Sequence, residues 1–342
     1  MKNYLKIAEN IMTNGELVGN RTGIRTKMVV GRDFRHDMRT GFPLLTTKKI
    51  NPNTIFVELE GFLNAVTDKK WYQERKCFIW DEWCNPQILK NEYDRFMDPE
   101  AQLGYLIKKQ ESNPSLSPKM IPLLESLDKE SRRDLSFDDV RKAIQLYETD
   151  LGPIYGYQWR SFGKQYSIDK LSELQYEYDG FEGVDQVTQL ITTMKNNPLD
   201  RRMIVNAWNP IAIKNNDMAL PPCHWAFNIQ SNGKDFDMLV NFRSWDFFLG
   251  APFNIAFYGM LMKLLEKETG LVARELIIQG ANVHFYENHF DQVSIQLTRE
   301  PRALPTLIIP DDNWNGIFNW HYNEYELTGY DPHPFIKAPV AV

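Results

Sequence analysis

One cysteine, Cys223, stands in the order Leu-Pro-Pro-Cys-His, and its chemistry depends on what lies beside it. A thiolate is a strong nucleophile, but an isolated cysteine is mostly protonated at neutral pH and needs a nearby cation or helix N-terminus. Two prolines directly before Cys223 restrict the backbone that presents the thiol. This pattern favours a nucleophile, whereas a lone cysteine without such a frame is usually a small buried apolar residue.

Arg243 is the cation that could reach this thiol, provided that two strands pair. Residues 225–230 and 236–242 alternate in the manner of strands, and the Ser-Asn-Gly-Lys stretch at 231–234 suits the turn between them. An antiparallel hairpin of these two strands would bring Arg243 next to Cys223.

Two segments that contain arginine could hold a phosphate group. Arg201 and Arg202 are adjacent, and two guanidinium groups side by side can bind one anion. Arg21 lies in a polar turn with threonine and glycine, where side-chain and backbone N–H groups could clamp a phosphate. For Arg21 a solvated loop is the other interpretation.

Three other side chains suit proton transfer or a sugar. Glu58 lies among apolar residues of a predicted helix, and a carboxylate in such surroundings can shuttle protons; a surface glutamate is the alternative. His284 and Tyr286 are two residues apart, so in an extended segment both side chains point to one face. Two donors on one face suit a ribose hydroxyl, and a core histidine is the alternative.

The elements that must position these residues follow from hydrophobic spacing. Apart from the hairpin, the pattern predicts helices at 1–18, 53–66, 184–197 and from 254 to about 269, and strands at 27–34 and 275–279. From about 85 to 150 the chain is polar with mostly helical spacing, which indicates an inserted helical subdomain; 161–182 is a second, shorter excursion.

Composition limits the classes of function. The formal charge of −6 argues against a main role in binding RNA or DNA, because no stripe of basic and aromatic residues compensates for it. The three cysteines do not form a secreted-type disulfide framework or a metal-ligand pattern, so we expect a protein of the reducing cytoplasm without a metal. No apolar run reaches membrane-spanning length, and we expect no membrane partner.

Three runs of sequence carry a resemblance to a known family. They are LPPCH at 220–224, RSWDFFLGAPFNIA at 243–256 and DRRMIVNAWNP at 200–210. They are similar to the signature of the thymidylate synthase family, which also includes pyrimidine hydroxymethylases. The resemblance implies an α+β fold with a large mixed β-sheet, flanked by helices, whose face forms a homodimer interface. It further implies one catalytic domain over 1–342, with the helical insert at about 85–150.

The implied reaction converts dUMP to dTMP with 5,10-methylenetetrahydrofolate as carbon donor and reductant, giving dihydrofolate. Cys223 would add to C6 of the uracil and thereby activate C5. By the same resemblance, Glu58 would organise water and shuttle protons at O4, and Tyr155 would lie on the route of the C5 proton. Asn254 would read the O4 and N3 edge, because its amide can both donate and accept.

The resemblance also assigns binding residues. The nucleotide phosphate would contact Arg21, Arg243, Ser244 and, from the partner subunit of the homodimer, Arg201 and Arg202, and the 3′-hydroxyl would contact His284 and Tyr286. The folate would contact Lys48 at its glutamyl tail, Asp246 at the pterin, and Ile79, Trp80, Trp83, Leu249, Gly250, Phe253 and the C-terminal Ala341. Trp80 and Trp83 offer flat surfaces for stacking, although two core tryptophans are the alternative.

The product leaves two alternatives open. Family members that hydroxymethylate dCMP carry aspartate where this chain has Asn254, so asparagine indicates a uracil base. A dUMP hydroxymethylase, which adds water instead of hydride to the methylene intermediate, is the runner-up. Departures from the family pattern, near which water could enter, are Glu60, Gly61, Phe242, Trp245, Phe257, Ala281 and Asn282. An inactive relative is disfavoured, because nucleophile, phosphate clamp and base reader are all in place.

Overall fold

The computed structural model describes residues 1–20, 22–87, 145, 148–166, 182–312 and 314–340. Most of the predicted insert at 85–150, together with Arg21 and Ala341, therefore lies outside the described residues. The chain forms two compact units: a sheet unit of residues 1–63, 185–207 and 223–342, and a smaller unit of residues 64–184 and 208–222. The assignment of 1–342 to one catalytic domain stays a prediction.

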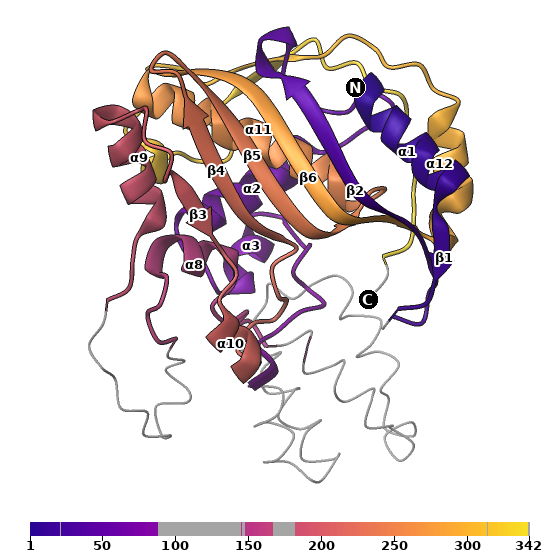
Figure 1. The fold of residues 1–342 in the computed structure, drawn as a ribbon, viewed down its shortest axis with the longest axis horizontal. Coiled ribbons are helices and arrows are strands. Elements are labelled where there is room, and N and C mark those ends of the chain that lie inside the picture. Colours follow the sequence, from indigo (N-terminus) through magenta and orange to yellow (C-terminus); the bar gives the residue numbers. More distant parts are fainter. Residues whose placement is uncertain (21, 88–144, 146–147, 167–181, 313, 341–342) are drawn as a thin grey trace. The chain divides into compact units, whose positions relative to one another are not determined.

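A six-stranded mixed sheet organises the sheet unit (Figure 1). Its strands lie in the order β1-β2-β6-β5-β4-β3. Their bounds are β1 (Glu16–Val18), β2 (Thr26–Asp37), β3 (Ile204–Asn206), β4 (His224–Ser231), β5 (Asp235–Asp246) and β6 (Val272–Tyr286). β5 and β6 run parallel, and every other neighbouring pair is antiparallel. The predicted large mixed sheet with flanking helices is thus confirmed.

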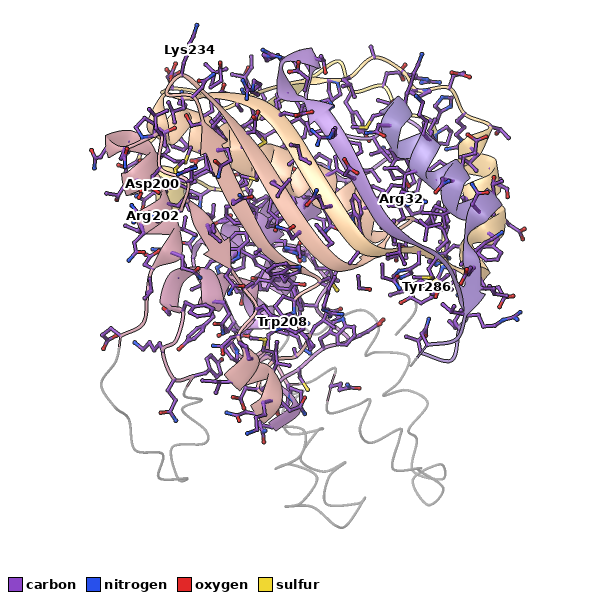
Figure 2. The ribbon with its side chains drawn as sticks, in the orientation of Figure 1. Arg32, Asp200, Arg202, Trp208, Lys234 and Tyr286 are labelled. Carbon is purple, nitrogen blue, oxygen red and sulfur yellow. The ribbon has the colours of Figure 1, made fainter. Side chains whose placement is uncertain are left out.

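The predicted hairpin is present as β4 and β5, with Ser231 opposite Phe236. In its turn Gly233 has φ of 90°, a conformation that glycine adopts without strain. The side chain of Asn232 accepts hydrogen bonds from the backbone N–H groups of Lys234 and Asp235, at 2.9 and 2.7 Å. Lys234 marks this turn in Figure 2.

Helices cover one face of the sheet. In the sheet unit these helices are α1 (Lys2–Asn14), α2 (Pro52–Leu63), α9 (Gln186–Asn196), α11 (Gly250–Thr269) and α12 (Phe290–Leu297), with the 3₁₀ turns η1 (Met38–Thr40), η4 (Glu287–His289) and η5 (Ile317–Asn319). α11 carries the chain from β5 to its parallel neighbour β6, as such a crossover requires, and packs with α2 behind the sheet in Figure 1. It ends at Gly270, which has φ of 76°.

Several predicted boundaries change. The expected helix at 1–18 ends at Asn14, because residues 16–18 pair with residues 26–28 as β1. The helix expected at 53–66 ends at Leu63, and the strand at 27–34 extends over 26–37. The helix expected from 254 begins at Gly250, which places Asn254 inside its first turns.

The remaining helices and strands are short. The sheet unit also contains a two-stranded sheet of β7 (Thr306–Ile308) and β8 (Glu326–Thr328). The smaller unit contains α3 (Lys69–Glu74), α8 (Tyr155–Ser161) and α10 (Pro210–Asn215). Its buried Lys69 donates hydrogen bonds to the carbonyl oxygens of Asp81 and Trp83, at 3.1 and 3.0 Å, and so ties the tryptophan segment to α3. No helix in the described part of the chain is long and apolar enough to cross a membrane.

Candidate active site

Cys223 and Arg243 are neighbours, as the hairpin predicts. Cys223 directly precedes β4, Arg243 lies in β5, and the Arg243 backbone N–H donates to the Cys223 carbonyl oxygen at 2.9 Å. The Nη2 atom of Arg243 lies 3.7 Å from the Cys223 sulfur, which is half-buried. A positive charge at this distance favours the thiolate over the thiol, so this pair can supply a nucleophile.

His224, the next residue, is enclosed by aromatic rings. Its ring centroid lies 6.2, 5.3 and 5.9 Å from those of Phe62, Phe242 and Phe257. Its Nδ1 is 2.6 Å from the hydroxyl of Tyr258. Burial lowers the pKa of His224 to about 3, so the imidazole is neutral at physiological pH. Two of the departures noted in the sequence, Phe242 and Phe257, thus form part of one apolar wall beside the nucleophile.

Tyr258 connects this wall to Glu58. Glu58 lies on α2 and Tyr258 on α11. Burial first, and the negative charge of Glu58 second, raise the pKa of Tyr258 well above its ordinary value. The phenol therefore keeps its proton, and its hydroxyl bonds His224 while the charge of Glu58 acts on it.

Glu60, two residues after Glu58, serves a different segment. Its buried carboxylate accepts a hydrogen bond from the Tyr322 backbone N–H at 3.0 Å and lies 3.2 Å from Nδ1 of His321. This departure from the family pattern therefore has a structural partner near η5.

The loop between β5 and α11 is held by Asp246. Its Oδ1 accepts from the backbone N–H groups of Phe248 and Leu249, at 3.0 and 3.2 Å. These bonds fix the turn that leads into α11, where Leu249, Gly250 and Phe253 are all half-buried.

In the parallel pair of β5 and β6, Asp246 lies beside His284 and Ser244 lies beside Asn282. Nδ1 of His284 lies 2.7 Å from Oδ1 of Asn282, and the rings of His284 and Tyr286 are 5.3 Å apart. Burial lowers the pKa of His284, while the charge of Asp246 opposes this shift. The structure therefore brings together the predicted folate contact Asp246 and the predicted ribose contacts.

Asn254 has a partner that sequence reasoning missed. Its Oδ1 accepts a hydrogen bond from the indole N–H of Trp245 at 3.2 Å. Trp245 stood out in the sequence only as a departure, and its contact depends on a turn between β5 and α11 that hydrophobic spacing does not predict. Tyr258 was also missed, because its contact with His224 joins α11 to β4, and local sequence does not predict which helix residue faces that strand.

Arg202 is engaged within its own loop. Its Nε and Nη2 atoms bind the two carboxylate oxygens of Asp200 at 3.0 and 2.6 Å, and the two residues lie together in Figure 2. Both Arg201 and Arg202 are exposed. Their predicted contribution to the site of a partner subunit stays a prediction.

Lys48 lies inward instead of on an open loop. It is 3% exposed, donates to the carbonyl oxygen of Phe248, and its ammonium sits 3.6 Å from the centroid of the Phe248 ring. Burial lowers its pKa to about 7, while the charge of Asp246 opposes this shift. In this arrangement the ammonium orders the loop before α11; its predicted contact with a glutamyl tail stays a prediction.

The smaller unit holds the other predicted folate contacts. Trp80 and Tyr155 are buried, and their ring centroids are 6.2 Å apart with planes at 62°. Ile79 is 37% exposed and Trp83 is half-buried, which leaves apolar surface at this segment.

The C-terminal segment is fastened to the sheet unit. His289 Nε2 donates to the Pro339 carbonyl oxygen at 2.7 Å, and Arg299 donates to the carbonyl oxygens of Thr47 and Pro334 at 2.8 and 2.7 Å. Phe335 and Val340 nevertheless remain 66% and 62% exposed. The predicted tail is therefore tethered while it keeps apolar side chains available for contact.

Comparison with known families identifies the family to which this chain is similar. A family model described as thymidylate synthase matches residues 2–342, the whole chain but for its first residue. It is a methyltransferase family whose members generally bind dUMP and use methylenetetrahydrofolate as cosubstrate. Among the residues that the structure describes, no group of three or more His, Cys, Asp or Glu side chains is arranged for a metal ion. The chain belongs to the thymidylate synthase family.

Proposed function

We propose that this protein methylates dUMP to dTMP, with 5,10-methylenetetrahydrofolate as carbon donor and reductant. The observation that carries the proposal is the half-buried Cys223 with the Arg243 guanidinium 3.7 Å from its sulfur. In the same unit Asn254 offers a half-exposed amide suited to a pyrimidine edge. A nucleophile and a base reader in one rigid sheet-and-helix frame meet the requirement of covalent pyrimidine chemistry.

In this mechanism Cys223 forms a bond to C6 of the uracil, which makes C5 nucleophilic. The cosubstrate supplies the one-carbon unit and the hydride. Arg243 keeps the sulfur anionic before attack, and after reduction the C6–S bond breaks and Cys223 is released. Glu58, coupled to Tyr258, would exchange protons with O4 through water, and Tyr155 of the smaller unit would receive the C5 proton.

Reduction is preferred to hydration because of the wall beside Cys223. The rings of Phe62, Phe242 and Phe257 surround His224, and burial holds its imidazole neutral. Such a wall gives water few polar groups to bind, and exclusion of water favours hydride transfer to a reactive intermediate. This supports dTMP as the product over 5-hydroxymethyl-dUMP.

A homodimer fits the sheet. Among the described residues of the sheet unit, no helix covers the sheet face that points toward the viewer in Figure 1. Apolar residues of three strands are exposed: Val30 of β2 by 71%, Ile204 of β3 by 53% and Trp225 of β4 by 39%. Exposed apolar residues on a sheet suit association with a second copy, which would place Arg201 and Arg202 across the interface.

The test is mass analysis of the nucleotide formed from dUMP and 5,10-methylenetetrahydrofolate, with the folate product measured in parallel. We expect dTMP and dihydrofolate. In Cys223→Ala we expect turnover to fall by about 10⁴-fold or more, because the covalent step is lost, while dUMP binding stays measurable. 5-Hydroxymethyl-dUMP with tetrahydrofolate would replace this proposal by hydroxymethylation, and turnover in Cys223→Ala near that of the unchanged protein would remove Cys223 from the mechanism.

A further inference from the structure

The indole of Trp245 is buried and commits its single donor to Asn254. Trp245 is 1% exposed, and its Nε1–H donates to Asn254 Oδ1 at 3.2 Å. A buried indole N–H needs an acceptor, because removing the donor from water without giving it a partner is unfavourable. The hydrogen bond therefore stabilises one orientation of the Asn254 amide.

The indole has little freedom to move. The ring of Phe242 lies 5.1 Å away at 31°, and that of Phe247 lies 5.0 Å away at 88°. On the strand beside it, a Cβ at Gly280 would come within 2.9 Å of Trp245 Cε3, so only glycine leaves room for the indole. Rigid neighbours on these sides fix the direction of the N–H group.

The orientation leaves a defined set of groups on Asn254. Its Nδ2 donates to no residue in the described ranges, and the side chain is half-exposed in the first turns of α11. Oδ1 retains one lone pair beyond the one that accepts from the indole. Rotating the amide by 180° would set its NH₂ group against the indole N–H, two donors facing each other.

Uracil and cytosine require opposite orientations of this amide. Uracil presents O4 as an acceptor and N3–H as a donor, which match Nδ2 and the free lone pair of Oδ1. Cytosine presents an N4 amino donor and an N3 acceptor, so it would need the rotated amide. We propose that Trp245 is a positioning residue that sets the preference for uracil by holding the Asn254 amide in one orientation. The proposal rests on the proposed function, in which Asn254 reads the base.

Calorimetric titration with dUMP and with dCMP tests this inference in Trp245→Phe, which removes the N–H and keeps a flat ring. We expect the ratio of dUMP to dCMP affinity to fall about tenfold, the value of one hydrogen bond. The matched control is Trp320→Phe: Trp320 is 2% exposed and donates its indole N–H to the Glu324 carbonyl oxygen at 3.1 Å. In Trp320→Phe the ratio of dUMP to dCMP affinity should equal that of the unchanged protein. Trp245→Leu, which also lacks the donor, replaces the phenylalanine variant if that does not fold.

A double variant separates positioning from packing. In Asn254→Asp the two carboxylate oxygens are equivalent, so there is no orientation to hold. Adding Trp245→Phe to this variant should then change the ratio less than twofold, while it changes the ratio about tenfold when Asn254 is intact. An unchanged ratio in folded Trp245→Phe, or the same change with and without Asn254→Asp, overturns the inference. If the unchanged protein itself binds dUMP no better than dCMP, the proposed function fails instead.

Discussion

His224 and Asn254 are two polar side chains of the sheet unit, each held by an aromatic partner, and they differ in what remains exposed. His224 is 7% exposed, with Nδ1 on the Tyr258 hydroxyl and phenylalanine rings around it. Asn254 is half-exposed, and the Trp245 indole takes only one of its polar positions. The comparison shows that an aromatic partner can withdraw a polar group from chemistry or orient it for a ligand, and burial decides between these outcomes.

The contrast between His224 and Asn254 is tested most strongly by changing the group that Asn254 presents to the base. In Asn254→Asp the carboxylate can only accept, so it repels O4 of uracil and binds the N4 amino group of cytosine. We expect the ratio of dUMP to dCMP affinity to fall on the order of 100-fold, measured by calorimetric titration. Asn254→Ala serves as control, because it should weaken both nucleotides without reversing the preference. An unchanged ratio in Asn254→Asp would mean that the base is read elsewhere.

Gly280→Ala disturbs the support of the indole without touching Asn254. The new Cβ would lie 2.4 Å from Val283 Cγ2 and 2.9 Å from Trp245 Cε3, and both side chains are buried. We expect the free energy of unfolding in urea to fall by about 2 kcal/mol, a typical cost of overpacking. Gly19→Ala is the control, since nothing lies within 4 Å of its Cβ position. Equal stability of the two variants would show that the indole can move.

The smallest effect concerns pH and His224. The pKa of His224 is lowered from 6.5 to about 3 by burial, so the unfolded chain binds a proton below pH 6.5 that the folded chain does not. The contribution of His224 to the free energy of unfolding is therefore fully present above pH 6.5 and decreases as the pH falls towards 3. Between pH 7.5 and 5.5 this loss is about 1.4 kcal/mol.

His224→Gln isolates that contribution from the other histidines, because glutamine does not titrate and can still bind the Tyr258 hydroxyl. Urea unfolding at pH 7.5 and 5.5 should show that the variant loses about 1.4 kcal/mol less than the unchanged protein. The same loss in both proteins would show that His224 is protonated in the folded state at pH 5.5, and the contrast with Asn254 would then disappear.

Much of the fold follows from local sequence. The hairpin of β4 and β5 was predicted from alternation and from the Ser-Asn-Gly-Lys turn, and it places Arg243 beside Cys223 as expected. β1 was not predicted, because residues 16–18 continue the spacing of α1 and become a strand only by pairing with β2. Local periodicity cannot show an edge strand of three residues when its partner supplies all of its hydrogen bonds.

The candidate site was predicted in its reactive groups but not in their supports. Cys223, Arg243 and Asn254 stand in recognisable motifs. Tyr258 and Glu60, by contrast, act through contacts with segments 34 and 262 residues away, and Trp245 acts across the turn between β5 and α11. Glu60 accepts a hydrogen bond from Tyr322, which follows η5 and lies 262 residues later in the sequence. Lys48 shows the limit most clearly: the resemblance assigns it to a glutamyl tail, and its burial against Phe248 depends on a contact between segments 200 residues apart.

The position of β2 in the sheet has a consequence for synthesis on the ribosome. Among the residues that the structure describes, β2 pairs with β1 and with β6, and its register joins Thr26 to Tyr286. The β6-facing edge of β2 therefore stays unpaired until residues 272–286 have left the exit tunnel. Closing so long a loop is slow, and an unpaired strand edge is prone to aggregate in the meantime. The nascent chain thus exposes a strand edge suited to chaperone binding in the interval before β6 emerges.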